Sequence, residues 1–263
     1  KRGIDLAVTA VCDKIDEISQ PVSSEEEIKH VASVSANGDE TIGILIAEAV
    51  DAAGKDGAIT IEESRSLKTS LDVVEGFRFE GGYVSSQFVT DERRGTIEYR
   101  DALMLITDES LDNVEEMLPI LEVAARDGRP LIIVAEEIEG QLLAALIMNR
   151  MRNGMKIAAV KAPRYGEERR WLLEDLAIVT GATLISKDSS IRLKNVRLKH
   201  LGSVKKIEIG KTRTTLADGE VDHERLETKI ESLKSLIEQV EDLREAQAYQ
   251  DRITRLSSAV SII

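Results

Sequence analysis

Cysteine, aromatic residues and long apolar runs are scarce in this chain of 263 residues. The single cysteine, Cys12, cannot form an internal disulfide, so nothing in the cysteine content argues for secretion. No apolar run reaches the roughly 18 residues of a membrane helix, and we expect neither a membrane span nor a signal peptide. The chain has only three Phe, four Tyr and one Trp, which predicts a core of aliphatic side chains.

The composition is that of an acidic globular protein. Apolar residues make up 42% and charged residues 32%, and the length suits one or two domains. Asp and Glu outnumber Lys and Arg by 48 to 35, which gives a formal net charge of -13. Such a surface repels phosphate backbones and anionic lipid, so we expect no nucleic-acid or membrane partner. Because the first residue is Lys1 rather than methionine, we expect a piece of a longer chain.

Helical patterns dominate the first fifty residues. Apolar residues alternate by steps of four and three from Ile4 to Ile18, and Cys12 falls beside this stripe, where packing is its expected role. Ser24 and Glu27 have the spacing of a capping box at the start of a second helix. The expected helices cover residues 4–18, 24–34 and about 39–53.

The rest of the chain alternates between strand and helix patterns. A strand is expected at 58–62 and an extended segment at 72–80, and we place a domain boundary near Gly76. Strands are then expected at 102–107, 131–135, 156–161, 183–186, 204–209 and 214–217, and helices at 111–126, 140–152, 167–179, 226–240 and from about 246 to 256. Continuous apolar strands between helices predict an α/β fold with βαβ crossovers and a mostly parallel sheet.

Motifs for catalysis or metal binding are missing. Gly210-Lys211-Thr212 resembles the end of a P-loop, but Lys205 stands where that motif requires glycine. The three histidines, His30, His200 and His223, lack the spacing of zinc ligands. The sequence contains neither a dinucleotide-binding glycine motif nor a nucleophile elbow. The residues themselves therefore predict no catalytic residue and no metal site.

The segments 111–126 and 140–152 are apolar on more than one stripe. Two alternatives remain open for them: both helices are buried on two sides, or one side forms an exposed apolar groove. An exposed groove would mark a binding site, and methionine adapts to varied partners. Two neighbouring helices with such a groove could take a helix or an extended peptide.

Several short strings, in order along the chain, are similar to a known family. They are Ser35-Ala-Asn37, Leu45-Ile-Ala-Glu-Ala49, Asp72-Val-Val-Glu-Gly76, Met117-Leu-Pro-Ile-Leu121, Ala135-Glu-Glu-Ile-Glu-Gly140, Val160-Lys-Ala-Pro163 and Leu173-Glu-Asp-Leu-Ala177. Together they resemble the group I chaperonins, the Hsp60 or GroEL family, over almost the whole chain. The resemblance implies an ATP-dependent molecular chaperone that assists protein folding.

The resemblance also implies which part of a chaperonin subunit is present. It implies the last equatorial helix at 1–20, a small α+β intermediate segment at 21–75, an apical βαβ sheet domain at 76–257, and the start of a second intermediate segment at 258–263. The nucleotide motif and the catalytic aspartate of the family fall outside this sequence. We therefore expect no cofactor and no ATP hydrolysis in this chain, with ATP and Mg²⁺ used by the parent protein.

Site residues follow from the resemblance, position by position. The apolar residues that bind non-native polypeptides, with one polar neighbour, match Tyr83, Phe88, Leu118, Leu121, Leu143, Ile147, Met148 and Asn149. The same groove is implied to take the mobile loop of a cochaperonin of the Hsp10 or GroES type. The implied setting is a homo-oligomeric ring in the cytoplasm or an organelle matrix.

Some positions depart from the family pattern. Gly76 matches the hinge glycine at the entry to the apical domain, but Ser258 and Ala259 replace the paired glycines at its exit, which predicts a stiffer hinge. Arg164 replaces a glycine, and Gln87 replaces an aromatic residue.

Two other classes of protein stay open from the residues alone. An α/β enzyme would place a small-molecule site at the carboxyl ends of its strands. A scaffold would assemble through the C-terminal helix, whose apolar repeat is shorter than three heptads.

Overall fold

The computed structural model describes residues 2–20, 22, 24–53, 58–60, 72–187, 189, 191–240, 242–257 and 259–262. The chain divides into two units, Lys1–Asp51 and Ala52–Ile263, and each is described by itself. The division falls before the boundary expected near Gly76, and the finer domain bounds from the resemblance stay a prediction.

The first unit is helical, as its sequence predicts. It contains α1 (Arg2–Ile18), α2 (Glu25–Ser35) and most of α3 (Glu40–Ala53). The capping box is confirmed, because the Glu27 N–H donates to Ser24 Oγ at 3.2 Å and the Ser24 N–H donates to Glu27 Oε2 at 3.1 Å. Cys12 is exposed, so the packing role expected for it is wrong; the apolar stripe beside it is exposed as well, with Ile4 at 70%.

An eight-stranded mixed sheet organises the second unit, in the order β1-β10-β2-β9-β8-β3-β5-β7. Its strands are β1 (Ala58–Thr60), β2 (Asp72–Phe79), β3 (Ile97–Ile106), β5 (Leu131–Ala135), β7 (Ile157–Lys161), β8 (Gly202–Ile209), β9 (Thr214–Gly219) and β10 (Ala259–Ile262). A second small sheet pairs β4 (Ser110–Leu111) with β6 (Glu137–Ile138).

The α/β class is confirmed, but the expectation of a mostly parallel sheet is wrong. Neighbours β3, β5 and β7 are parallel, as are β1 and β10, whereas β3–β8, β8–β9, β9–β2 and β2–β10 are antiparallel. The physical reason is chain length. Only residues 210–213 join β8 to β9, and a parallel pair would need a crossover of a dozen residues or more.

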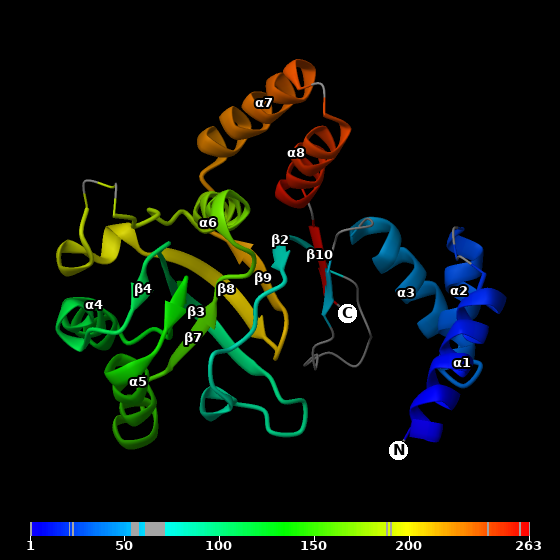
Figure 1. The fold of residues 1–263 in the computed structure, drawn as a ribbon, viewed down its shortest axis with the longest axis horizontal. Helices are drawn as coiled ribbons and strands as arrows, with labels where there is room; N and C mark the ends of the chain where they lie inside the picture. Colours follow the sequence, from blue (N-terminus) through cyan, green and yellow to red (C-terminus); the bar gives the residue numbers. More distant parts are fainter. Residues whose placement is uncertain are drawn as a thin grey trace. The chain divides into compact units, whose positions relative to one another are not determined.

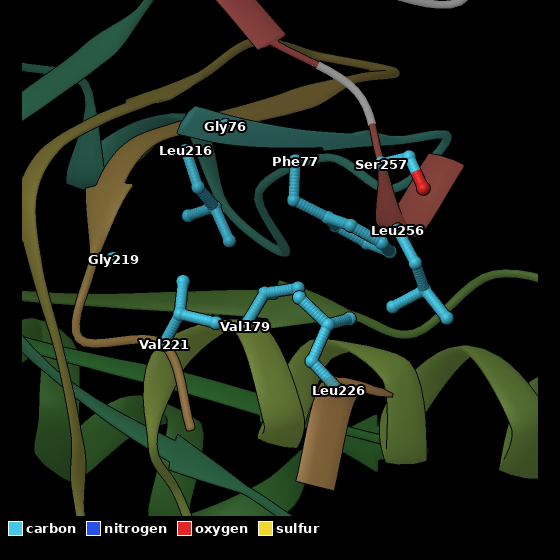
Figure 2. Close-up of a pocket in the computed structure, with 9 residues that line it drawn as sticks. All are labelled: Gly76, Phe77, Val179, Leu216, Gly219, Val221, Leu226, Leu256 and Ser257. Atoms are coloured by element: carbon cyan, nitrogen blue, oxygen red, sulfur yellow. The ribbon is translucent and has the colours of Figure 1, made fainter. Parts of the chain in front are cut away.

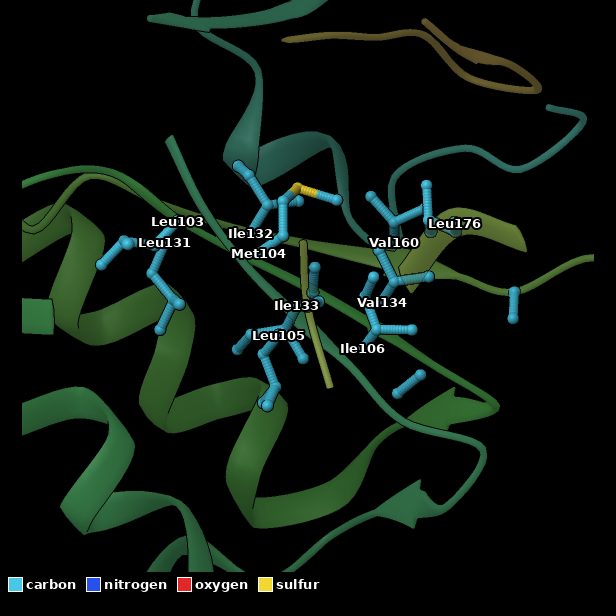
Figure 3. Close-up of a cluster of buried hydrophobic side chains, with 14 of the residues drawn as sticks. Leu103, Met104, Leu105, Ile106, Leu131, Ile132, Ile133, Val134, Val160 and Leu176 are labelled. Atoms are coloured by element: carbon cyan, nitrogen blue, oxygen red, sulfur yellow. The ribbon is translucent and has the colours of Figure 1, made fainter. Parts of the chain in front are cut away.

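Helices cover both faces of the parallel strands. Figure 1 shows α4 (Val114–Asp127) and α5 (Gly140–Asn153) on one side of the sheet and α6 (Gly166–Thr180) on the other. Along β3, Leu103 and Leu105 point to one face and Met104 and Ile106 to the other (Figure 3), and all four are at most 1% exposed. The core is aliphatic, as the low aromatic content predicts.

Helix ends follow local chemistry. Gly128 and Gly181 end α4 and α6 in the left-handed conformation, with φ of 81° and 68°. The C-terminal part forms two helices, α7 (His223–Gln239) and α8 (Leu243–Leu256), as predicted. In the part of the chain that the structure describes, no helix is both long and apolar enough to cross a bilayer.

The strand expected at 183–186 does not form. Only Ile185 makes a bridge, to Thr107, while the Thr183 N–H donates to the carbonyl of His200 at 3.0 Å. The segment divides its backbone hydrogen bonds between the sheet and the 3₁₀ turn at Leu198–His200, so a regular ladder is not made.

Candidate functional site

The apolar helices α4 and α5 are neither fully buried nor simply amphipathic. Each buries one stripe against the sheet: Met117, Ile120, Leu121 and Ala124 on α4, and Leu142 and Leu146 on α5. Each also exposes large apolar side chains on the side away from the sheet. Leu118 and Met148 are both 47% exposed and Met151 is 67% exposed.

Half-buried residues of α5 extend this exposed region. Leu143 and Ile147 are partly buried and pack on the core, and with Met151 they follow one another at steps of four on a single helix face. We define the α4/α5 surface as Leu118, Leu143, Ile147, Met148 and Met151. Helices α4 and α5 contact one another, so the two parts of this surface are neighbours.

Asn149, the predicted polar neighbour, is partly buried on α5. Its side-chain amide donates to the carbonyl of Ala145 at 3.0 Å, one turn earlier in the same helix. The polar side-chain amide of Asn149 thus has a hydrogen-bond partner within its own helix, beside the apolar residues.

The segment 83–89 runs along the edge of the site. The Val84 N–H donates to the carbonyl of Ala159 at 2.9 Å, which ties the segment to β7, and Tyr83 is partly buried. Phe88 lies in the 3₁₀ turn η1 (Ser86–Phe88) and is 0% exposed. The Phe88 ring therefore belongs to the core and anchors the segment rather than presenting its side chain on the surface.

Arg150 on α5 holds the same segment and was not singled out from the sequence. Its Nη1 donates to the carbonyl of Gln87 and its Nη2 to the carbonyl of Val89, both at 2.6 Å. The sequence offers no signal that separates Arg150 from Arg152, a second cation on the same helix that is exposed. Met151, the most exposed apolar residue of α5, was also left out of the predicted site.

The eight predicted residues thus fall into three groups. Leu118 and Met148 are exposed, and Tyr83, Leu143, Ile147 and Asn149 are partly buried. Leu121 and Phe88 are buried, and in this conformation neither can offer its side chain to a partner. The structure brings the residues to two adjacent helices and one neighbouring segment. The exposed and partly buried residues form a surface, and the buried Leu121 and Phe88 support it from the core.

The predicted hinge residues lie in the sheet where they are described. Gly76 of β2 pairs with Ala217, and Ala259 of β10 pairs with Glu75. Ser258 lies outside the described residues.

Charged pairs border the site near the start of α5. Lys161 donates to Glu137 at 2.8 Å, and this hydrogen bond lowers the pKa of the Glu137 carboxyl and raises the pKa of Lys161. Arg169 pairs with Glu136 at 2.6 Å. Among the described side chains, no three His, Cys, Asp or Glu residues come together as metal ligands would.

A mixed α/β sheet with an exposed apolar helix pair is typical of a protein that binds other molecules through its surface. The chain matches the TCP-1/cpn60 chaperonin family over residues 1–237, and it belongs to that family. Membership implies a chaperonin-type role in protein folding, with binding of unfolded polypeptides and assembly into oligomers.

Proposed function

We propose that the α4/α5 surface is the place where this chaperonin binds non-native polypeptides. The observation that supports the proposal is the exposure of Leu118, Met148 and Met151 on two adjacent helices, each of which buries a separate apolar stripe in the core. An acidic globular chain gains nothing for its own fold from apolar side chains in water. Their position is explained if a partner covers them.

The driving force is burial of apolar surface. An unfolded chain exposes side chains that a folded protein hides, and each Å² removed from water gains about 25 cal/mol. The flexible thioethers of Met148 and Met151 can adapt to many sequences, as binding of varied unfolded chains requires. Several copies in a ring would add avidity without any new contact.

The proposal includes the finer identity implied by the resemblance. We infer a group I chaperonin in which the second unit contains the apical domain, and a cochaperonin loop of apolar character that competes for the same surface. Rotation of the apical domain would then release the polypeptide. No catalytic residue is assigned to this chain, and ATP and Mg²⁺ are expected to act elsewhere in the subunit.

The test compares surface variants with a matched control. A labelled, chemically unfolded protein is titrated with the chain and with its Leu118→Ser, Met148→Ser and double variants, without ATP. Leu243→Ser, at an 85% exposed leucine of α8, removes an equally apolar side chain away from the surface. We expect the double variant to weaken binding about tenfold or more, while Leu243→Ser and the native form of the labelled protein serve as controls.

The free energy of unfolding of each variant shows whether the substituted side chain serves the binding surface or the core. Leu118→Ser and Met148→Ser should leave the free energy of unfolding nearly unchanged, because both side chains are half exposed. If these variants bind the unfolded protein as well as the parent chain does, the α4/α5 surface is not the binding site. If Leu243→Ser weakens binding equally, the interaction is unspecific apolar contact and the proposal fails.

A further inference from the structure

A second hollow of the same unit is built from charged rather than apolar residues. It has a volume of about 300 Å³ and lies where the end of β2, the loop before α6, the start of β9 and α8 meet. Its lining includes the four arginines Arg78, Arg164, Arg213 and Arg255, the two acids Glu80 and Asp251, and the apolar residues Phe79, Pro163 and Leu172. None of these residues belongs to the α4/α5 surface, so this site is independent of the proposed function.

Three of the four arginines have no acidic partner. Arg164 pairs with Glu168 at 2.8 Å, one turn into α6. Among the described residues, no carboxylate lies within ion-pair distance of Arg78, Arg213 or Arg255, although the chain carries 48 acidic residues. In a chain with a net charge of -13, a hollow with an excess of positive charge runs against the overall composition.

Two of these arginines have lowered pKa values, because the acids near them only partly offset burial and mutual repulsion. Burial and the neighbouring charge of Arg213 lower the pKa of the Arg78 guanidinium, although the carboxylate of Glu80 raises it. Burial is also the main cause that lowers the pKa of Arg255; attraction to Asp175 and Asp251 raises it, and repulsion from Arg164 and Arg252 lowers it. Like charges that are partly removed from water repel each other more strongly than on an open surface.

Arg164 adds a conformational cost at the same place. Its φ is +66°, in the left-handed region that only glycine enters freely. A glycine would adopt this backbone conformation without strain, but it would not place a guanidinium at the hollow. Repulsion and strain therefore coincide in one site, which is typical of residues that serve a ligand rather than the fold.

We propose that this hollow binds a small anion that carries a diphosphate group. The planar fork of a guanidinium matches two oxygens of a phosphate, and charge-assisted hydrogen bonds of this kind are the strong ones. Three arginine forks without an ion-pair partner can bind more oxygens than one phosphate provides, which favours two linked phosphates. Glu80 and Asp251 at the same hollow repel any anion, so only a ligand that gains enough from the guanidinium groups can bind there.

A bound diphosphate would connect four separate elements. Arg78 belongs to β2, Arg164 lies in the loop before α6, Arg213 lies just before β9, and Arg255 lies in the last turn of α8. The anion would hold α8 against the sheet near the point where the chain leaves α8 for β10. Because it would bind only the folded arrangement, it should also raise the unfolding temperature.

The test measures binding of inorganic pyrophosphate to the whole chain by calorimetry and by thermal unfolding, at constant ionic strength and without metal ions. Orthophosphate and citrate are the comparison anions. We expect one pyrophosphate per chain, bound about tenfold or more tightly than orthophosphate and citrate. Arg78→Gln and Arg213→Gln should each weaken binding about tenfold or more. Arg126→Gln, at an 85% exposed arginine side chain of α4, is the matched control and should bind like the parent chain.

Thermal unfolding of each variant without anion shows whether the variant is folded, so that a loss of binding is not mistaken for a folding defect. Arg213 is exposed, so Arg213→Gln removes repulsion and little packing, and this variant should unfold at a temperature no lower than the parent chain. The proposal is overturned if pyrophosphate does not bind at millimolar concentration, or if Arg78→Gln and Arg213→Gln bind it undiminished. Equal binding of citrate would also overturn it, because the site would then recognise negative charge alone.

Discussion

Asp175 on α6 and Arg252 on α8 form a buried, two-point ion pair. Arg252 Nη2 donates to Asp175 Oδ1 at 2.6 Å and its Nε donates to Oδ2 at 2.9 Å, with both side chains less than 5% exposed. The guanidinium also lies 5.2 Å from the centre of the Trp171 ring. Burial raises the pKa of the Asp175 carboxyl against the opposing effect of Arg252. The pair joins the C-terminal helices to the sheet domain.

We predict that Arg252→Met lowers the free energy of unfolding by about 3–5 kcal/mol, because it leaves the Asp175 carboxylate buried and unpaired. The double variant Asp175→Leu, Arg252→Met should recover most of that loss, since no buried charge then remains. Urea unfolding of both variants measures the effect. Arg126→Gln, which breaks the exposed pair with Glu122, should change stability by less than about 0.5 kcal/mol. A double variant as unstable as Arg252→Met would contradict this account.

Arg150 is predicted to position the segment 83–89 beside α5. Arg150→Gln removes the two short hydrogen bonds to the carbonyls of Gln87 and Val89, each of which contributes about 1.5–3 kcal/mol when the donor is charged. Amide hydrogen exchange should therefore speed up in residues 84–96, with little change in β3. Arg152→Gln is the matched control, at an exposed arginine of the same helix. Unchanged exchange in Arg150→Gln would show that Phe88 alone anchors the segment.

Gly82 is predicted to be required for the close approach of two backbones. A Cβ at this position would lie 2.0 Å from the carbonyl oxygen of Lys211, so Gly82→Ala must push the turn at 210–213 away. We expect a loss of about 1–3 kcal/mol in unfolding free energy, typical of overpacking. Gly210→Ala is the control, because its Cβ would meet only the Arg213 carbonyl oxygen at 3.4 Å, an ordinary contact. Equal stability of the two variants would refute the prediction.

Local chemistry made much of the fold predictable from the sequence. Ser24 and Glu27 begin a helix, and Gly128 and Gly181 end two others, through groups that lie within a few residues of each other. The alternation of apolar strands and helices predicted the parallel part of the sheet, because this pattern too is local in the sequence. The antiparallel partners of β2 and β10 are far apart in the sequence, and no local pattern indicates them.

The sequence predicted which helices carry the residues of the candidate site, but not how far each side chain is exposed. Leu118 and Leu121 lie on the same helix and were predicted together, yet Leu118 is 47% and Leu121 is 7% exposed. Helical period places both on apolar stripes, but the width of the buried stripe depends on how α4 sits on the sheet and on the residues around η2 (Leu193–Asn195). Phe88 is buried because the 3₁₀ turn directs it into the core, a geometry that no spacing rule indicates.

An apolar cavity beside Gly76 should be sensitive to the volume of its lining. Figure 2 shows Phe77, Val179, Leu216 and Leu256 around this cavity. Its volume is about 130 Å³. Leu216→Ala should enlarge this space and cost about 2–5 kcal/mol, the usual range for truncating a buried leucine. Val179→Ile adds one methylene toward the existing space and should gain up to about 0.8 kcal/mol. Urea unfolding distinguishes these outcomes, and a destabilised Val179→Ile would show that the cavity cannot accept a larger side chain.

His200 gives the structure a pH dependence near neutrality. Burial lowers the pKa of its imidazole, and the charges of Lys199 and Arg197 lower it further. Its Nδ1 accepts a hydrogen bond from the Arg197 N–H at 3.1 Å, which requires the unprotonated nitrogen.

Because the pKa of folded His200 lies below the unfolded value of about 6.5, the folded state binds fewer protons between the two values. Its contribution to stability is therefore complete above about pH 6.5 and is lost as the pH falls from there to the folded pKa. We expect an NMR titration of the His200 ring to give a pKa below about 6.5, and urea unfolding at about pH 5 and pH 8 to show a smaller pH dependence in His200→Gln than in the parent chain. The glutamine amide oxygen can accept the same hydrogen bond at both pH values. An unchanged pH dependence in His200→Gln would assign the effect to other groups.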